Sequence, residues 1–276
     1  MFDKVSRSWE LVKASASVLR SDKELMLFPV ISGLVTLAVA ATFLVPALAL
    51  KAFANGIGAG GVLFGVLCYF VLYSIIIFFN CALVGAAMIR LEGGDPTLAD
   101  GFRAARARIP SILGYAAIAA TVGVLLQGLK NKDNFLVRVM ASALGAAWTL
   151  ATFLVVPVLV SRDVGPIDAL KQSVALLKRT WGENAVGQMG IGAAFGLITF
   201  GVVVVGVATT VFAAQLSGAL AVLVGALFLL AVLLVGVYQA ALSGIYSAAL
   251  YRYAVSHETP DAFRGADLEH AFLPKD

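Results

Sequence analysis

The chain has 276 residues, is 61% hydrophobic and only 13% charged, and carries a net charge of +4. Between Asn184 and Tyr251 there is no Asp, Glu, Lys or Arg over 68 consecutive residues. A charged side chain at the centre of a bilayer costs at least about 2.5–3.5 kcal/mol. Stretches this long without charge are therefore typical of segments in lipid, and they exclude an ordinary soluble domain.

Six apolar runs are long enough to cross a hydrocarbon core of roughly 30 Å, which takes about 20 residues. In chain order the runs are 25–50, 62–89, 110–129, 139–161, 185–213 and 218–251. Gln215, Ser217 and Gly218 are the only turn signals between the last two runs, and they predict a tight hairpin with a connection of four or five residues. The sequence predicts an all-α polytopic membrane protein with six transmembrane helices, paired as three hairpins.

Three prolines, Pro29, Pro46 and Pro157, lie within one or two turns of the ends of these runs. A proline in the middle of a span kinks the helix, and in a transporter such a kink can mark a gate. The positions near the ends favour ordinary helix-end geometry instead.

The distribution of positive charge orients the predicted spans. Sixteen of the 20 Lys and Arg residues lie in the segments 1–24, 90–108, 162–181 and 252–276. The connections on the other side hold only Lys51, Lys130, Lys132 and Arg138. Since loops on the cytoplasmic side carry an excess of Lys and Arg, we expect both termini and both long basic connections to be cytoplasmic.

Each predicted hairpin follows a short amphipathic segment on the basic side. Apolar residues recur at helical spacing over 2–19, 98–109 and 167–181, with basic residues off the apolar stripe. An arginine ends the second span of every hairpin, and a proline then opens the next segment; the arginines are Arg90, Arg162 and Arg252, and the prolines are Pro96, Pro166 and Pro260.

This order favours an internal repeat of three units, each an amphipathic helix followed by a membrane hairpin. The units are 1–89, 95–161 and 165–251, within a single membrane domain over 1–252. Residues 253–276 form a cytoplasmic tail that begins with a partial fourth amphipathic helix. The alternative is that membrane boundaries simply favour Arg, Pro and Asp.

Small residues recur on the faces of the last three spans. These are Gly236, Ala240, Gly244 and Ala248 in the sixth span, Ala143, Ala147 and Ala151 in the fourth, and Gly192 and Gly196 in the fifth. Small residues let helix backbones approach closely in lipid. The faces predict either packing inside the bundle or contact between copies in a homo-oligomer, and the sequence leaves both open.

Polar groups at membrane depth are few. We find no Asp, Glu, Lys, Arg or His there, although proton- and ion-coupled carriers usually need one. Asn80 and Gln239 are the deepest amides, and with Tyr73 and Tyr238 they are where a polar pathway would lie. The alternative for each amide is an interhelical hydrogen bond, worth about 0.6–2 kcal/mol.

Catalytic motifs are absent from the sequence, which contains no G-x-S-x-G, phosphate-binding loop or H-E-x-x-H. His257 and His270 are the only histidines, and both lie in the polar tail, where we expect no metal site. We therefore expect neither an enzyme nor a bound cofactor. An enzyme acting on lipid would have to use acids of the basic-side loops, such as Glu92, Asp95 or Glu183.

Basic residues on the amphipathic segments are candidates for contact with anionic lipid headgroups. They are Arg7, Lys13, Arg103, Arg106, Lys171 and Lys178. An apolar stripe against acyl chains with Lys and Arg toward headgroups is the pattern of an interfacial helix, although ordinary helices beside a membrane look alike. The expected partners are membrane lipids; a second copy of the chain is the alternative that the Gly/Ala faces leave open, and nucleic acid is not expected.

The chain resembles a family of bacterial and archaeal six-span membrane proteins classed as a domain of unknown function. The likeness covers essentially the whole chain and rests on Phe2-Asp3-Lys4 through Ser8-Trp9, on Leu25 to Phe28-Pro29, and on the connection 166–170. More distantly, the plan resembles the membrane domain attached to some glycerophosphodiester phosphodiesterases. The resemblance implies a prokaryotic cytoplasmic membrane and assigns no functional residue.

Two functional hypotheses follow. The first is a non-enzymatic membrane protein that organises membrane or partners through its cytoplasmic amphipathic helices, and it is favoured by the lack of catalytic groups and the uncharged spans. The second is a channel or facilitator for a small neutral or apolar solute, which needs no buried charge.

Overall fold

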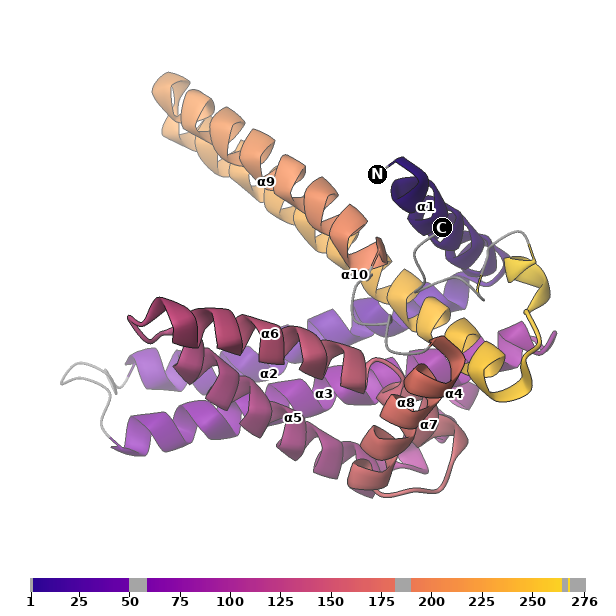
Figure 1. Ribbon diagram of the computed structural model, residues 1–276. Helices are drawn as coiled ribbons and strands as arrows, with labels where there is room; N and C mark the ends of the chain where they lie inside the picture. The colour runs from indigo at the N-terminus through magenta and orange to yellow at the C-terminus, as the bar shows by residue number, and fades with distance from the viewer. Residues whose placement is uncertain (1, 50–58, 182–189, 265–267, 269–276) are drawn as a thin grey trace.

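A computed structural model describes residues 2–49, 59–181, 190–264 and 268, and the regular structure of this part of the chain is helical (Figure 1). Six helical segments are long and apolar enough to cross a membrane. They are Lys23–Leu48, Gly60–Leu91, Ile109–Lys130, Phe135–Ser161, Ile198–Leu216 and Gly218–Ser256. The predicted all-helical chain with six candidate spans is confirmed. The predicted start of the fifth span, residues 185–189, lies outside the described residues.

The first third of the chain forms a helix, a short connector and a hairpin. In order these are α1 (Phe2–Ser21), the 3-10 helix η1 (Lys23–Met26), α2 (Leu27–Ala49) and α3 (Ala59–Leu91). Pro29 lies in the first turn of α2, where the missing N–H has no intrahelical partner to lose. Phe28 beside it is almost fully buried, and it anchors the start of the span in the core.

The middle of the chain continues with a short helix and a second hairpin. Its elements are α4 (Leu98–Arg106), α5 (Ile109–Lys130), α6 (Phe135–Thr152) and α7 (Val155–Ser161). Thr97 caps α4 in a reciprocal capping box with Asp100, which satisfies backbone donors at both residues. Asn134 caps α6 by accepting hydrogen bonds from two backbone N–H groups. Both helix starts are therefore encoded locally.

The fourth span is not one helix, as the run 139–161 predicted, but two. Pro157 has no N–H to bond the carbonyl of Phe153, and the helix breaks between α6 and α7. The Leu154 N–H donates instead to the Oγ of buried Ser173, at 3.1 Å. Ser173 belongs to α8, so a distant helix satisfies the backbone donor that the break exposes. Pro157 thus lies near a helix end, but that end is inside the span.

The last third contains α8 (Pro166–Trp181), α9 (Gly190–Leu216), α10 (Gly218–Ser256) and the short 3-10 helix η3 (Asp261–Phe263). Only Ser217 separates α9 from α10, so the connection is shorter than predicted. Its hydroxyl accepts a hydrogen bond from the Leu220 N–H and caps α10. Of the predicted partial fourth amphipathic helix, the described residues show η3, whose Phe263 is fully buried. Residues 265–267 and 269–276 lie outside the described part of the chain.

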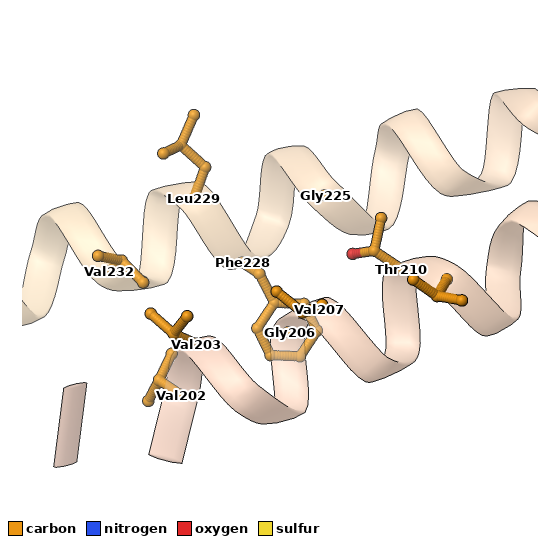
Figure 2. A pocket seen from close by; sticks show the side chains of 10 residues that line it. Val202, Val203, Gly206, Val207, Thr210, Gly225, Phe228, Leu229 and Val232 are labelled. Atoms are coloured by element: carbon orange, nitrogen blue, oxygen red, sulfur yellow. The ribbon is translucent and has the colours of Figure 1, made fainter. Parts of the chain in front are cut away.

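The hairpin of α9 and α10 diverges from the bundle that α2, α3, α5 and α6 form (Figure 1). Its two helices pack closely where Gly206 meets Phe228, because a Cβ at Gly206 would lie 2.8 Å from the ring. Figure 2 shows this ring against α9, beside a groove of about 390 Å³ lined by apolar side chains of both helices and by Thr210. The outer half of the hairpin is mainly apolar on its exposed surface, with Val222 and Phe212 largely accessible.

The buried core lies where α3, α7 and the second half of α10 meet. Leu83, Leu154 and Leu242 are fully buried there. A Cβ at Gly244 would lie 2.5 Å from Leu83, so this glycine of the α10 stripe allows close approach inside the bundle. Ala248 is also buried.

Other members of the small-residue faces are not packed inside the bundle. Gly236 and Gly196 have open space where a Cβ would lie, and Ala143 and Ala147 are exposed. The surroundings of Gly192 are outside the described part of the structure. The small-residue faces thus divide into an internal part at Gly244 and Ala248 of α10 and an external part on α6, on α9 and at Gly236 of α10. Contact between copies through the external part stays a prediction.

Candidate functional site at the basic end of the bundle

Polar and charged residues gather at one end of the bundle, which we call the basic end. Here α1, α4, α7 and α8 surround the last turns of α3 and α10 (Figure 1). α1 buries Val12, Ala16 and Leu19 against the protein and exposes Lys13. Its predicted apolar stripe is therefore used mainly for packing on the bundle, whereas Trp9, at 49% exposed, remains accessible.

A network of carboxylates joins η1 to the start of α4. Asp22 caps η1 by accepting a hydrogen bond from the Glu24 N–H at 3.1 Å. Glu24 in turn accepts from the Leu98 N–H of α4, also at 3.1 Å. The Thr97 hydroxyl donates a hydrogen bond to the carboxylate of Asp100 at 2.7 Å. This bond is the main reason why the pKa of Asp100 is lowered. η1 is thereby tied to the first turn of α4.

Asp22 carries a buried charge in this network. The residue is only 6% exposed, and its second carboxylate oxygen has no hydrogen-bond partner among the described residues. Burial raises the pKa of Asp22, and the nearby Arg90 guanidinium acts in the opposite direction. A buried carboxylate whose charge is only partly compensated is costly to fold, so Asp22 is a position where stability depends on protonation.

Arg90 ends the second span and ties down the loop that follows. Its Nη1 donates to the carbonyl oxygen of Gly94 at 3.3 Å and to the carboxylate of Asp95 at 3.4 Å. Gly93 in this loop has φ +87°, a conformation that favours glycine. The loop is thus closed around the guanidinium by local geometry.

Arg162 and Arg252, which hold the corresponding places in the other hairpins, lie in different surroundings. Arg162 donates to the hydroxyl of Tyr251 at 3.2 Å and to the side-chain oxygen of Gln172 at 2.9 Å. Nη1 of Arg252 is buried and has no hydrogen-bond partner among the described residues. The arginines share a place in the sequence plan, but the structure does not give them one common set of contacts.

The residues predicted to contact lipid headgroups are distributed over three helices. Arg103 and Arg106 are exposed on α4, Lys171 and Lys178 on α8, and Lys13 on α1. Arg103 pairs with Asp100 at 2.9 Å and Lys171 with Asp168 at 3.5 Å, one helical turn away in each case. Exposed pairs of this kind contribute little to stability. The side chain of Arg7 lies outside the described part of the structure.

The residues of the predicted polar pathway lie on α3 and α10, two helices that contact each other. The Gly244–Leu83 contact sets the register of these helices, and in that register Asn80 and Gln239 lie at nearly the same depth. Both amides are partly buried, and Tyr73 and Tyr238 pack against the core. Neither amide lines the groove on the α9–α10 hairpin.

Two of the acids considered for lipid chemistry, Glu92 and Asp95, lie on the loop that follows α3. Asp95 pairs with Arg90 and is 98% exposed, and Glu92 is also exposed. Glu183 lies outside the described residues. Sequence reasoning missed Glu24 and Ser173, whose bonding partners are 74 and 19 residues away. No local pattern marks either residue, because each looks like an ordinary polar position on a helix.

The fold and the arrangement of polar groups at one end define a multi-pass helical membrane protein. The chain belongs to the family of unknown function DUF6159, whose model matches residues 57–261. The connection 166–170 lies inside the matched segment, whereas Phe2 to Pro29, which also supported the resemblance, lie outside it. No curated protein matches the chain.

Proposed function

We propose that the protein is a non-enzymatic component of a prokaryotic cytoplasmic membrane that organises lipid, with both termini and the basic end in the cytoplasm. The observation that carries the proposal is the placement of exposed Lys and Arg side chains on α1, α4 and α8, three helices that surround one end of the spans. The threefold plan of a short helix followed by a hairpin belongs to the same proposal, supported by the order of the elements.

The exposed Lys and Arg side chains of the basic end attract an anionic membrane surface. Each Lys or Arg close to an anionic leaflet adds about 1 kcal/mol of attraction. Exposed side chains on three separate helices let these contributions act around the bundle rather than at one point. The apolar side chains that remain exposed on α8, Ile167 and Val174, can contact acyl chains beside the charges. Lipid in contact with the basic end is thereby enriched in anionic headgroups.

Lipid retention tests this proposal. The triple variant Arg103→Gln, Arg106→Gln, Lys171→Gln removes three positive charges from the basic end. We expect it to release anionic lipid from the purified protein, measured by native mass spectrometry from mixed nanodiscs. A matched control removes three charges from the opposite end, at Lys130, Lys132 and Arg138, which are also exposed. Equal loss of anionic lipid in both variants would contradict the proposal.

The second candidate function, a channel or facilitator for a small neutral solute, is favoured by the interrupted fourth span. Interrupted helices often contribute to substrate sites in transporters, although here Ser173 already satisfies the Leu154 N–H. A solute flux in proteoliposomes that Asn80→Leu or Gln239→Leu abolishes would establish this function and overturn the first. Flux unchanged by both substitutions would exclude the pathway at these residues.

A further inference from the structure

A small polar cavity lies at the basic end, apart from the exposed basic residues on which the proposed function rests. Its volume is about 210 Å³, and its polar lining comes from Ser17 and Ser21 of α1, Arg90 of α3, Gly93 and Asp261. The cavity thus joins three segments that are distant in the sequence: the end of α1, the end of α3 and η3. The cavity lies beside the last turn of α3, at the end of the second candidate span.

The two serines present lone pairs to the cavity. The Ser17 hydroxyl donates its proton to the carbonyl of Ala14 at 2.7 Å, and the Ser21 hydroxyl donates to the carbonyl of Ser17 at 3.0 Å. A hydroxyl whose proton is engaged can still accept hydrogen bonds. The carboxylate of Asp261 pairs with Arg264 at 2.6 Å and has further acceptor capacity. The cavity therefore offers three acceptor groups.

Arg90 supplies the donor. Its hydrogen bonds to Gly94 and Asp95 both use Nη1, and a guanidinium carries five N–H donors, so donors remain for an anion. A ligand with only negative charge would meet the carboxylate of Asp261. A ligand with only positive charge would meet Arg90. The lining is complementary to a molecule that carries both charges a short distance apart.

We propose that this cavity binds a small zwitterion with a phosphate and a primary ammonium, the chemistry of phosphoethanolamine. Arg90 holds the phosphate by charge-assisted hydrogen bonds. The three N–H donors of the ammonium are directed to Ser17, Ser21 and Asp261. A quaternary ammonium has no N–H group and cannot make these bonds, so the cavity discriminates against phosphocholine. The ligand can be the headgroup of a phospholipid or a soluble phosphoethanolamine.

The double variant Ser17→Ala, Ser21→Ala tests the assignment. Both serines are exposed on a helix and alanine favours helix, so the fold is retained. Each lost hydrogen bond is worth about a factor of five in affinity, and we expect the preference for the ethanolamine headgroup to fall roughly 10- to 30-fold. The matched control is Ser142→Ala, Thr149→Ala on α6, where the hydroxyls also donate to a carbonyl one turn back.

Two measurements distinguish the sources of the ligand. The first is native mass spectrometry of the full chain from nanodiscs that contain phosphatidylethanolamine and phosphatidylcholine in equal amounts. The second is the shift in melting temperature caused by soluble phosphoethanolamine, phosphocholine or inorganic phosphate in the absence of ethanolamine lipid. Preferential retention of the ethanolamine lipid, lost in the double variant and kept in the control, supports a headgroup site. A shift with soluble phosphoethanolamine alone supports a soluble ligand.

Three results would overturn the assignment. They are equal retention of both lipids with no shift from soluble phosphoethanolamine, an equal shift from inorganic phosphate, and a preference that survives the double variant. None of them depends on the charges of α4 and α8 that test the proposed function. Lipid retention at the basic end can therefore fail while the cavity binds, or the reverse.

Discussion

The contact between α4 and the bundle depends on a glycine, which makes Gly101 the most informative position to perturb. A Cβ at this position would contact the Phe28 ring and lie 2.6 Å from the carbonyl oxygen of Ala82. The ring can turn, but the carbonyl is part of the backbone of α3 and cannot move without shifting that helix. Phe102 beside it packs edge-on against Phe28, with ring centroids 5.5 Å apart, so α4 has little room to retreat.

We expect Gly101→Ala to destabilise the protein by up to about 2 kcal/mol. Overpacking a tight contact costs about 1–3 kcal/mol, and the gain in helix propensity from glycine to alanine offsets about 1 kcal/mol of this cost. Thermal unfolding of the purified protein in detergent measures the effect. Gly33→Ala is the matched control, because a Cβ there has no neighbour within 4 Å and only the propensity gain remains.

Gly101→Ala should also change the lipid retention of the basic end. α4 carries Arg103 and Arg106, and its first turn is tied to Glu24. Displacement of α4 should therefore lower the retention of anionic lipid together with the melting temperature. A melting temperature of Gly101→Ala equal to or above that of Gly33→Ala would refute the packing argument.

Three further substitutions test other features of the structure. Asp22→Asn keeps the helix cap and removes the buried carboxylate. Because burial raises the pKa of Asp22 in the folded state, protonation stabilises the native protein as pH falls from neutrality toward the unfolded pKa. In melting experiments the variant should therefore be at least as stable as the native protein at pH 7 and should lose this advantage near pH 4. Ser173→Ala leaves the buried Leu154 N–H without a partner and should cost about 1–3 kcal/mol in thermal unfolding, a loss that Ser173→Thr should not show if the hydroxyl alone matters. Gly206→Ala should lower the melting temperature by pushing the ring of Phe228 away from α9, and Phe228→Leu in the same chain should restore part of the loss; additive losses would contradict the contact.

The spans could be predicted from the sequence because lipid acts on every residue of a span. A charge-free run of 68 residues leaves few alternatives to membrane helices. Local caps were equally accessible in principle, since Thr97 and Asp100 lie three residues apart and form a box by themselves. Ser217 also acts within its own turn, although the connection it makes is shorter than predicted.

Features that depend on distant partners could not be predicted in this way. The break before Pro157 is stable because Ser173 of another helix reaches the Leu154 N–H. The stripe on α10 looks uniform in the sequence, yet Gly244 is packed against Leu83 while Gly236 faces open space. Spacing along one helix shows that a face consists of small residues. Only the position of the partner helix shows which part of that face is buried.

The long-range polar contacts of the described residues show which part of the bundle has the most closely defined geometry. Hydrogen bonds and ion pairs between different elements occur at the basic end, in the pairs Glu24–Leu98, Arg108–Asp163, Ser111–Val164, Leu154–Ser173, Arg162–Tyr251 and Arg179–Ala254. Toward the other end, α9 and the first half of α10 meet through apolar contacts such as Phe228 on Gly206. Apolar contacts between membrane helices compete with equally apolar lipid, and they define an arrangement less strictly than directed hydrogen bonds. The basic end is therefore the part of the bundle whose geometry the chain specifies most closely, which is what a surface that recognises headgroups requires.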